Sequence, residues 1–357
     1  MRLGAGAALV DGALVPGDVE IDGGRIARVG VSGRGRGIAA PGFVDLQVNG
    51  FAGVDLMHAD AGGYARAGAA MLATGVTAYL PTFITAPEAD ILAALAVLPS
   101  GPEILGAHLE GPFLAPGRLG AHPAAWRRDP DPALLDRLLA TGRVTHVTLA
   151  PELPGALDLV DALVRRGITI AAGHTDATAA EAHAAFDRGV RTVTHLFNAM
   201  RPALPRDPGV ALAALARPDV RVQVIADGHH VAAESLLVAW RAARGRIALV
   251  TDAVEAAGMG DGTYTLGGRE VVARGGVVRT AEGTLAGSTL TMIGAVRHVH
   301  GLGVPLEEAL SAASATPAAI LGRDDLGRLA PGARADVVLL DDRLEIVRVV
   351  RAGDASG

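Results

Sequence analysis

Four residues that can bind a metal or carry a proton stand at the ends of separate apolar segments: Glu110, His174, His195 and Asp252. One carboxylate oxygen and two imidazole nitrogens make the three-ligand set of a catalytic zinc-type site, with one position left for water. Such a metal lowers the pKa of its water toward about 7, and a nearby carboxylate can take the proton. The pattern predicts a metal-dependent hydrolase in which the first three residues are ligands and Asp252 is the acid and base.

Each of these residues alone has a structural alternative. A histidine at a strand end is more often hydrogen-bonded structure than a ligand, and an aspartate such as Asp252 is a common helix N-cap. The combination favours catalysis, because the active sites of α/β barrels lie at the carboxyl ends of different strands.

The elements that must position these residues follow from the alternation of Val/Ile/Leu segments with Ala/Leu-rich ones, which is typical of parallel βα units. Eight strands are the number of a TIM-type barrel. The fold class predicted is therefore α/β, a (β/α)8 barrel. The predicted strands lie near residues 39–49, 76–84, 104–110, 144–152, 168–174, 191–197, 220–227 and 246–252. The predicted helical segments include 62–74, 132–140, 156–166 and 178–188, with a hairpin at 262–279 and closing helices at 288–301 and 306–321.

Both ends of the chain hold short apolar stretches separated by Gly and Asp, which favours strands joined by turns. Residues 1–40 plus 328–357 are predicted to form one small β-sandwich domain, and residues 41–327 the metal-dependent barrel hydrolase. The length of 357 residues allows this, because such barrels run to about 250 residues.

Composition excludes several classes of protein. The chain is 50% hydrophobic and 20% charged with a net charge of -6, which excludes disorder and gives no global attraction to nucleic acid or to an anionic membrane. It has no cysteine, and all 32 basic residues are arginine. Disulfides, thiol nucleophiles, Schiff-base lysines and a metal pair bridged by a carboxylated lysine are excluded.

No segment of the chain reads as membrane-spanning. The longest helical-looking apolar run, residues 91–98, is far shorter than the roughly 20 residues that cross a bilayer. The apolar stretch at residues 3–10 has no basic region or clear cleavage site. A cytoplasmic location is therefore predicted.

The motifs around these residues make the chain resemble the N-acetylglucosamine-6-phosphate deacetylases of the amidohydrolase superfamily. The match covers essentially the whole chain, in order. The segments Glu110-Gly-Pro112 and His195-Leu-Phe-Asn-Ala-Met200 are strongly diagnostic. The matching segments are Pro41–Asp45, His108–Pro112, Gly173–Asp176, Thr194–Met200, Asp227–His230, Leu249–Ala253 and Leu285–Ser288.

The resemblance implies hydrolysis of the N-acetyl group of N-acetyl-D-glucosamine 6-phosphate to D-glucosamine 6-phosphate and acetate by a metal-activated water. It implies one divalent metal per subunit on Glu110, His174 and His195, with zinc expected first and iron, manganese or cobalt as alternatives. Asp252 would be the general acid and base, and His122 would hold or polarise the acetamide. The implied substrate-binding residues are His122, Asn198, Ala199, Arg206, His230, Leu285, Ala286, Gly287 and Ser288.

The resemblance also implies a homodimer, because the phosphate site of this family draws on the partner subunit. The residue types agree with an anionic substrate, since the guanidinium of Arg206 suits bidentate phosphate binding in a chain without lysine. A solvated loop arginine is the structural alternative.

Two positions depart from related sequences. Amidohydrolases with two metals usually carry His-x-His at the end of the first strand, whereas this chain has Gln47-Val-Asn49, so one metal is expected. Pro205 precedes Arg206 where many members of the family carry histidine, which leaves the phosphate contacts open.

Two other functions remain open at this point. The same barrel and metal could deacetylate a related N-acetyl amino sugar, phosphorylated or not, or an N-acyl amino acid. Rates on phosphorylated and unphosphorylated N-acetylglucosamine would separate these substrates. A barrel that has lost activity and serves as a binding or scaffold protein is the third hypothesis, and a lack of bound metal would support it.

Overall fold

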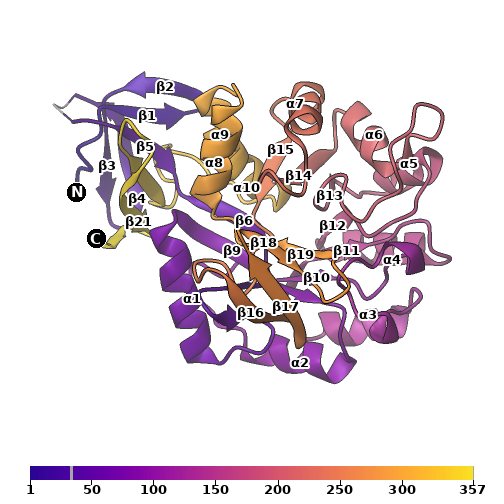
Figure 1. Cartoon of the computed structure of the whole chain (residues 1–357). Helices are drawn as coiled ribbons and strands as arrows, with labels where there is room; N and C mark the ends of the chain where they lie inside the picture. Colours follow the sequence, from indigo (N-terminus) through magenta and orange to yellow (C-terminus); the bar gives the residue numbers. More distant parts are fainter. Residues whose placement is uncertain (33–34, 357) are drawn as a thin grey trace.

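A barrel of parallel strands forms the centre of the molecule (Figure 1). The structure is a computed structural model that describes residues 1–32 and 35–356. Within these residues, eight parallel strands follow one another around the barrel, and the two end strands meet where the Asp252 amide donates to the Gln47 carbonyl (2.9 Å). In this order the strands are β6 (Phe43–Val48), β9 (Val76–Ile84), β10 (Ala107–Glu110), β11 (Val144–Leu149), β12 (Thr169–Ala172), β13 (Thr192–Val193), β14 (Arg221–Ile225) and β15 (Ile247–Val250).

Helices surround this barrel and cover its outer face (Figure 1). Each buries one stripe of apolar residues, as α4 does with Leu159, Val160 and Leu163. Local capping fixes where several helices begin; at α5, the Thr178 hydroxyl and the Glu181 side chain form a reciprocal capping box. The helices are α1 (Ala61–Ala73), α2 (Glu88–Val97), α3 (Pro132–Leu139), α4 (Ala156–Arg165), α5 (Ala179–Asp187), α6 (Gly209–Ala216), α7 (Ala233–Ala242), α8 (Met292–Gly301), α9 (Leu306–Ala313) and α10 (Ala315–Ile320).

The two ends of the chain share a second sheet beside the barrel (Figure 1). Its strands, in order, are β2 (Ala13–Pro16), β1 (Ala7–Val10), β5 (Ile38–Pro41), β20 (Val337–Leu340), β21 (Ile346–Arg351) and β22 (Asp354–Ser356). Strands β3 (Asp18–Asp22) and β4 (Arg25–Val31) pair with each other, and Val19, Ile21 and Ile26 share an apolar core with Val337 and Leu339. The predicted class, a barrel with a β-sandwich built from both termini, is confirmed.

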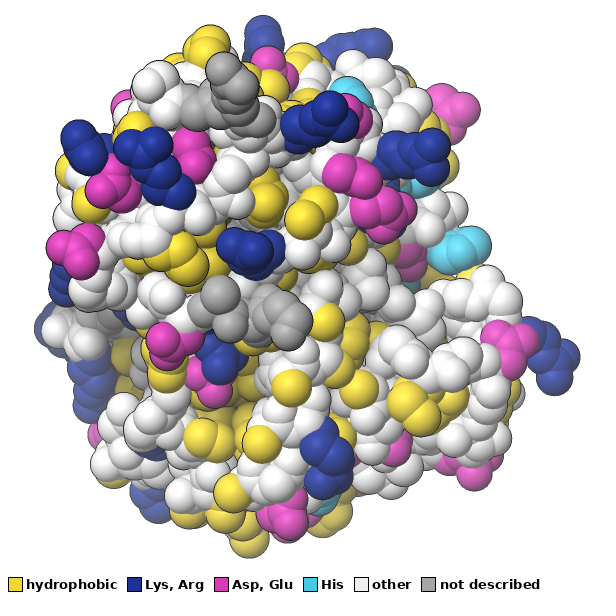
Figure 2. All heavy atoms as spheres, turned by 90° about the vertical axis from the view of Figure 1, so that its left-hand side faces the viewer, with side chains coloured by type: hydrophobic (Ala, Val, Ile, Leu, Met, Phe, Trp, Pro, Cys, Tyr) yellow, Lys and Arg dark blue, Asp and Glu magenta, His cyan; other side chains and the backbone are white. Residues whose placement is uncertain are grey.

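The outer face of this β-sandwich carries charges of both signs. Figure 2 shows arginines and acidic side chains interspersed over it, with small apolar areas between them. The described part of the chain contains no helix long and apolar enough to cross a membrane.

Several boundaries differ from the predictions. The predicted strand 39–49 is two strands, β5 and β6, separated by Gly42, where a Cβ atom would lie 2.2 Å from the Thr77 hydroxyl oxygen. The predicted closing helix 306–321 is α9 and α10, broken at Ser314, and the one predicted at 288–301 begins at Met292. The division of the chain into domains at residues 41 and 327 stays a prediction.

A four-stranded sheet follows the barrel, where a hairpin was predicted. Its strands, in order, are β16 (Gly262–Leu266), β17 (Arg269–Arg274), β18 (Val277–Arg279) and β19 (Leu285–Ser288), and it lies across the same end of the barrel as Asp252, because the Ser288 amide donates to the Asp252 carbonyl (2.8 Å). A short hairpin, β7 (Gly50–Phe51) with β8 (Val54–Asp55), and two 3-10 turns (Pro116–Arg118 and Ala124–Trp126) complete the described elements.

Candidate active site

The carboxyl ends of the barrel strands line one cavity of about 290 Å³. Most of the predicted site residues lie in its wall, although they are spread over much of the sequence. The predicted residues that line it are Glu110, His122, His174, His195, Asn198, Ala199, His230, Asp252, Leu285 and Gly287.

The three predicted metal ligands converge on one point. Glu110 Oε1 lies 3.2 Å from His174 Nε2 and 3.0 Å from His195 Nε2, and the two nitrogens are 3.1 Å apart. All three side chains are buried. Tetrahedral bonds of ~2.0–2.1 Å, as zinc makes with N and O ligands, place ligand atoms about 3.3 Å apart. The spacing therefore fits a small divalent cation at their centre.

For His174 and His122, the hydrogen bond at the second ring nitrogen shows which of them can offer a lone pair. His174 Nδ1 faces the Arg118 carbonyl (2.8 Å), which can only accept, so Nδ1 carries the proton and Nε2 of the neutral ring is free to bind a metal. His122 Nδ1 accepts the Thr85 backbone N–H (3.2 Å), so its neutral ring carries the proton on Nε2. Although Glu110, His122 and His174 also place ligand atoms within 4.8 Å of one another, these bonds favour His174 as a ligand and His122 as a hydrogen-bond donor.

His122 is neutral at pH 7 in this environment. Burial and the neighbouring His174 lower its pKa to about 4. Its Nε2 lies 3.4 Å from Glu110 Oε2 and faces the cavity in which the other predicted residues meet. The ring is therefore placed to donate a hydrogen bond to an oxygen that lies beside Glu110.

The pKa values of the two buried carboxyl groups, Glu110 and Asp252, are shifted in opposite directions. Burial works against ionisation of Glu110, but its contacts with His174, His122 and His195 outweigh burial and hold the pKa of its carboxyl well below the usual value. Burial and the negative Glu110 raise the pKa of Asp252 to about 8. One carboxylate that stays charged and one that can accept and return a proton are the pair that acid–base hydrolysis needs.

Two amide side chains hold these carboxylates in place. Gln47 Nε2 donates to Glu110 Oε1 (2.9 Å), and Asn49 Nδ2 donates to Asp252 Oδ1 (2.7 Å). Gln47 and Asn49 point to the same side of the chain because alternate residues of a strand share a face. The sequence indicates only that they are not imidazole ligands; their positioning role was missed.

The backbone is strained at three of the predicted catalytic positions. His174 (φ 49°), His195 (φ 28°) and Asp252 (φ 49°) have positive φ, which is uncommon outside glycine. Each lies just beyond the last residue of its barrel strand. Strained residues of this kind cluster at functional sites, because the surrounding structure must hold them in place.

Three predicted substrate-binding residues do not line the cavity. Ala286 packs in an apolar cluster with Val254, and the Ser288 hydroxyl donates to the Thr251 carbonyl (2.6 Å), so both support the wall from behind. Arg206 is exposed and has no side-chain partner within residues 1–32 and 35–356. Cavity residues that the sequence did not predict to bind metal or substrate include Asn49, Ile84, Gly117, Arg118, Gly120, Ala121, Ile225, Leu266 and Thr284.

The polar residues near Arg206 are tied into the site by ion pairs. Asp176 accepts from the guanidinium of Arg118 (2.7 Å) and from that of Arg201 (3.3 Å), and Arg201 also pairs with Asp207 (2.8 Å). Because the Arg118 carbonyl accepts from His174, this network links the loop beside Arg206 to a predicted metal ligand.

Fold and site together define a metal-dependent barrel hydrolase of the amidohydrolase class. Comparison with known proteins agrees, because the sequence matches the amidohydrolase family over residues 38–355. The chain is 41% identical to the N-acetylgalactosamine-6-phosphate deacetylase of Escherichia coli over 90% of its own length and 88% of that protein. It is also 41% identical to the N-acetylglucosamine-6-phosphate deacetylase of Vibrio furnissii, over 86% of this chain and 79% of that one.

A solved structure supports the same relationship at the level of the fold. N-acetyl-D-glucosamine-6-phosphate deacetylase from Mycobacterium smegmatis, as a mutant in complex with N-acetyl-D-glucosamine-6-phosphate, superposes with a TM-score of 0.95 at 39% identity, covering 99% of this chain and 98% of that one. The chain belongs to the N-acetylglucosamine-6-phosphate deacetylases of the amidohydrolase family.

Proposed function

We propose that the protein hydrolyses the N-acetyl group of N-acetyl-D-glucosamine 6-phosphate to give D-glucosamine 6-phosphate and acetate. One observation carries this proposal: Glu110, His174 and His195 converge within 3.2 Å of one another, beside Asp252 and His122, in a single cavity of a chain about 40% identical to such deacetylases.

We assign Glu110, His174 and His195 as the ligands of one divalent metal. When bound, the metal supplies a Lewis acid and a water of lowered pKa. Zinc is proposed, since one oxygen and two imidazole nitrogens suit it, although iron, manganese or cobalt fit the same donors. Gln47 and Asn49 stand where a two-metal site would carry a His-x-His pair, and their side chains donate to Glu110 and Asp252, which supports one metal rather than two.

The remaining roles belong to residues with free polar atoms. Asp252 takes a proton from the attacking water and returns it to the amine that leaves, while Asn49 fixes one of its oxygens. His122 donates from Nε2 to the acyl oxygen as negative charge develops there, as one donor of an oxyanion hole. Asn198 and His230 line the cavity on the side where the sugar would lie.

A second candidate substrate differs from the first only in the configuration of the sugar. The relative from Escherichia coli is an N-acetylgalactosamine-6-phosphate deacetylase and is as similar to this chain as the glucosamine enzyme from Vibrio furnissii. N-acetyl-D-galactosamine 6-phosphate is therefore the alternative, and rates on the two epimers, each with and without phosphate, decide between them.

We further propose a homodimer in which Arg206 serves the partner's site. Arg206 does not line the cavity of its own subunit, and two apolar side chains near it in the chain, Leu204 (53% exposed) and Leu212 (36%), are exposed. An exposed apolar area beside a free arginine suits an interface that delivers a phosphate ligand. A cytoplasmic location is also proposed, because a charged phosphate ester does not enter an apolar bilayer.

The experiment that tests the proposed function replaces Asp252 by Asn and measures both metal content and acetate release from N-acetylglucosamine 6-phosphate. The variant is expected to hold one metal per chain but to lose at least ~100-fold in turnover, the lower end of the general acid–base contribution. Asp324→Asn, an exposed aspartate, is the control and should match the wild type. Near-normal acetate release from Asp252→Asn would contradict the assignment, and an active enzyme free of metal would contradict the mechanism.

A further inference from the structure

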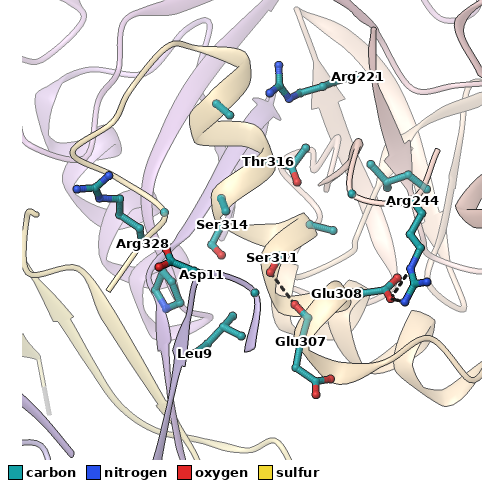
Figure 3. A pocket seen from close by; sticks show the side chains of 18 of the residues that line it. Leu9, Asp11, Arg221, Arg244, Glu307, Glu308, Ser311, Ser314, Thr316 and Arg328 are labelled. Carbon is teal, nitrogen blue, oxygen red and sulfur yellow. Dashed lines mark hydrogen bonds and ion pairs between the residues drawn. The ribbon is translucent and has the colours of Figure 1, made fainter. Parts of the chain in front are cut away.

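A second cavity, of about 480 Å³, lies at the opposite end of the barrel from the predicted metal ligands. Figure 3 shows side chains that line it. Arg221 and Ile247 in its wall are the first residues of β14 and β15, whereas the active-site residues follow the last residues of their strands. The terminal sheet contributes Leu9 and Asp11, and α10 contributes Thr316. The cavity therefore lies between the barrel and the terminal sheet and shares no lining residue with the active site.

Part of its polar lining has no partner within the protein. The guanidinium groups of Arg221 and Arg328 make no hydrogen bond or ion pair to any residue that the structure describes. Thr316 is only 7% exposed, yet its hydroxyl has no partner among the same residues. Figure 3 shows this hydroxyl directed toward the space that Ser311 and Ser314 border. The Thr316 hydroxyl therefore opens to the cavity and is free to bond a ligand there.

Other polar groups in the cavity wall already have hydrogen-bond partners within the protein. Arg244 and the Trp240 indole both bond to the Glu308 carboxylate (2.8 and 3.0 Å), which leaves that corner neutral and presents the indole as an apolar surface. The hydroxyls of Ser311 and Ser314 donate to their own helix and keep lone pairs that can accept. The groups left to bind a ligand are the Arg221 guanidinium, the Thr316 hydroxyl and the lone pairs of Ser311 and Ser314. The Trp240 indole adds an apolar surface.

Asp11 and Glu307 also line the cavity without a side-chain partner among the described residues. Carboxylates of this kind accept hydrogen bonds from hydroxyl or ammonium groups, and they disfavour a ligand that is anionic throughout. The ligand that fits carries a phosphate at one end and a neutral or cationic polyol at the other. The volume is within the ~300–1,000 Å³ of small-molecule sites.

We propose that this cavity is a second binding site, for a small phosphorylated sugar, with the phosphate on Arg221 and Thr316 and the hydroxyl groups toward Asp11 and Glu307. A guanidinium and a hydroxyl that line one cavity can both donate to a phosphate, and the guanidinium can do so through two N–H groups. The site is independent of the proposed function, because none of its residues lies at the metal cluster.

The test is the number of D-glucosamine 6-phosphate molecules bound per chain of the metal-loaded enzyme, measured by isothermal titration calorimetry. Two are expected in the wild type, one at each cavity. Arg221→Ala and Thr316→Val should each weaken the second site at least tenfold while acetate release stays unchanged, and Arg348→Ala, an exposed arginine of β21, should keep both sites.

One ligand per chain in the wild type would overturn the proposal, as would two equal sites in Arg221→Ala and Thr316→Val together. Titrations with inorganic phosphate and with D-glucose 6-phosphate show whether the second cavity recognises the phosphate alone or the whole sugar phosphate. Equal affinity for inorganic phosphate would mean a general anion site and would also overturn the proposal. A protein that releases no acetate but still binds sugar phosphate at Arg221 would contradict the proposed function and leave this site standing.

Discussion

In His174 and His122, the hydrogen bond made by Nδ1 decides whether Nε2 carries a proton or a lone pair. Among the buried histidines of the cavity, His174 donates to a carbonyl and presents a lone pair, whereas His122 accepts an amide and presents a proton. Residues of the same type, whose ring centroids lie 4.4 Å apart, are thus suited to opposite tasks. The difference depends on backbone groups of Arg118 and Thr85 rather than on the histidines themselves.

This separation predicts the behaviour of two variants. His122→Phe should keep one metal per chain and lose about 100-fold or more in kcat, the size of one oxyanion-hole donor. His174→Phe should lose the metal, because no lone pair replaces Nε2. Metal analysis of the purified variants and acetate release with added zinc check both outcomes. If His122→Phe loses metal as completely as His174→Phe, then His122 is a ligand and the tautomer argument is wrong.

How far single residues can be predicted depends on where their partners lie. The convergence of Glu110, His174 and His195 could be predicted because each lies at the end of an apolar run, whereas their role as metal ligands stays a prediction. The roles of Gln47 and Asn49 could not, since their partners are 63 and 203 positions away in the sequence. The role of an amide side chain can be assigned only when its hydrogen-bond partner is known.

At the scale of elements, burial explains which strands were predicted well. Strand β9 is buried at all nine positions and reads as a continuous apolar run, as parallel strands covered on both faces do. Strand β13 has only two residues, Thr192 and Val193, and the strand predicted at 191–197 is much longer than that. The break between α9 and α10 was missed because Ser314 lies among alanines that would continue a helix; the signal for it is Pro317, which cannot donate to the carbonyl of residue 313 and so ends the preceding helix.

A chain of hydrogen bonds inside the barrel ties four strands together beneath the metal cluster. The ring of His108 faces the hydroxyls of Thr82 (3.2 Å) and Thr148 (2.7 Å), and Thr148 continues to Thr194 (2.7 Å). All of these side chains are buried, and burial lowers the pKa of His108 to about 4, so its ring is neutral. Two of these residues are close in sequence to predicted ligands: Glu110 lies two residues after His108, and His195 follows Thr194.

Thr148→Val should break this chain without changing the shape of the side chain. The ring of His108 and the hydroxyl of Thr194 would each lose a partner inside the barrel, at about 1–3 kcal/mol for each buried group left unpaired. The free energy of unfolding, from urea denaturation, should fall by roughly 2–6 kcal/mol. Thr263→Val, on an exposed position of β16, is the matched control and should stay within about 0.5 kcal/mol of the wild type. Equal stability of the two variants would show that these buried hydrogen bonds do not stabilise the fold.

For the whole molecule, the barrel depends on one seam where its first and last strands meet. Sheet pairing runs continuously from β6 around to β15, and the two ends are joined by the Asp252 amide on the Gln47 carbonyl and by the carboxylate of Asp45. Asp45 accepts from the Thr251 hydroxyl (2.6 Å) and from the Thr251 amide (3.2 Å). A single buried side chain therefore holds both sides of the closure just below Asp252.

The charge state of Asp45 should make the stability of the whole fold depend on pH. Asp45 is 1% exposed, and burial raises its pKa from 3.8 to about 7 despite the hydrogen bonds from Thr251. Because the folded state then binds the proton more tightly than the unfolded state, the stability from this group is complete below about pH 4 and is lost as pH rises toward 7.

At about 1.36 kcal/mol per pKa unit, the wild type should lose roughly 3 kcal/mol between pH 5 and pH 8 from this group alone. Asp45→Asn keeps a neutral acceptor at every pH, and its stability should lack this decline. Urea denaturation of both proteins at pH 5, 6, 7 and 8 measures the gap, which should narrow or change sign as pH rises. Parallel curves would mean that Asp45 ionises as freely in the folded barrel as in water, and the seam would then be held by its backbone hydrogen bonds alone.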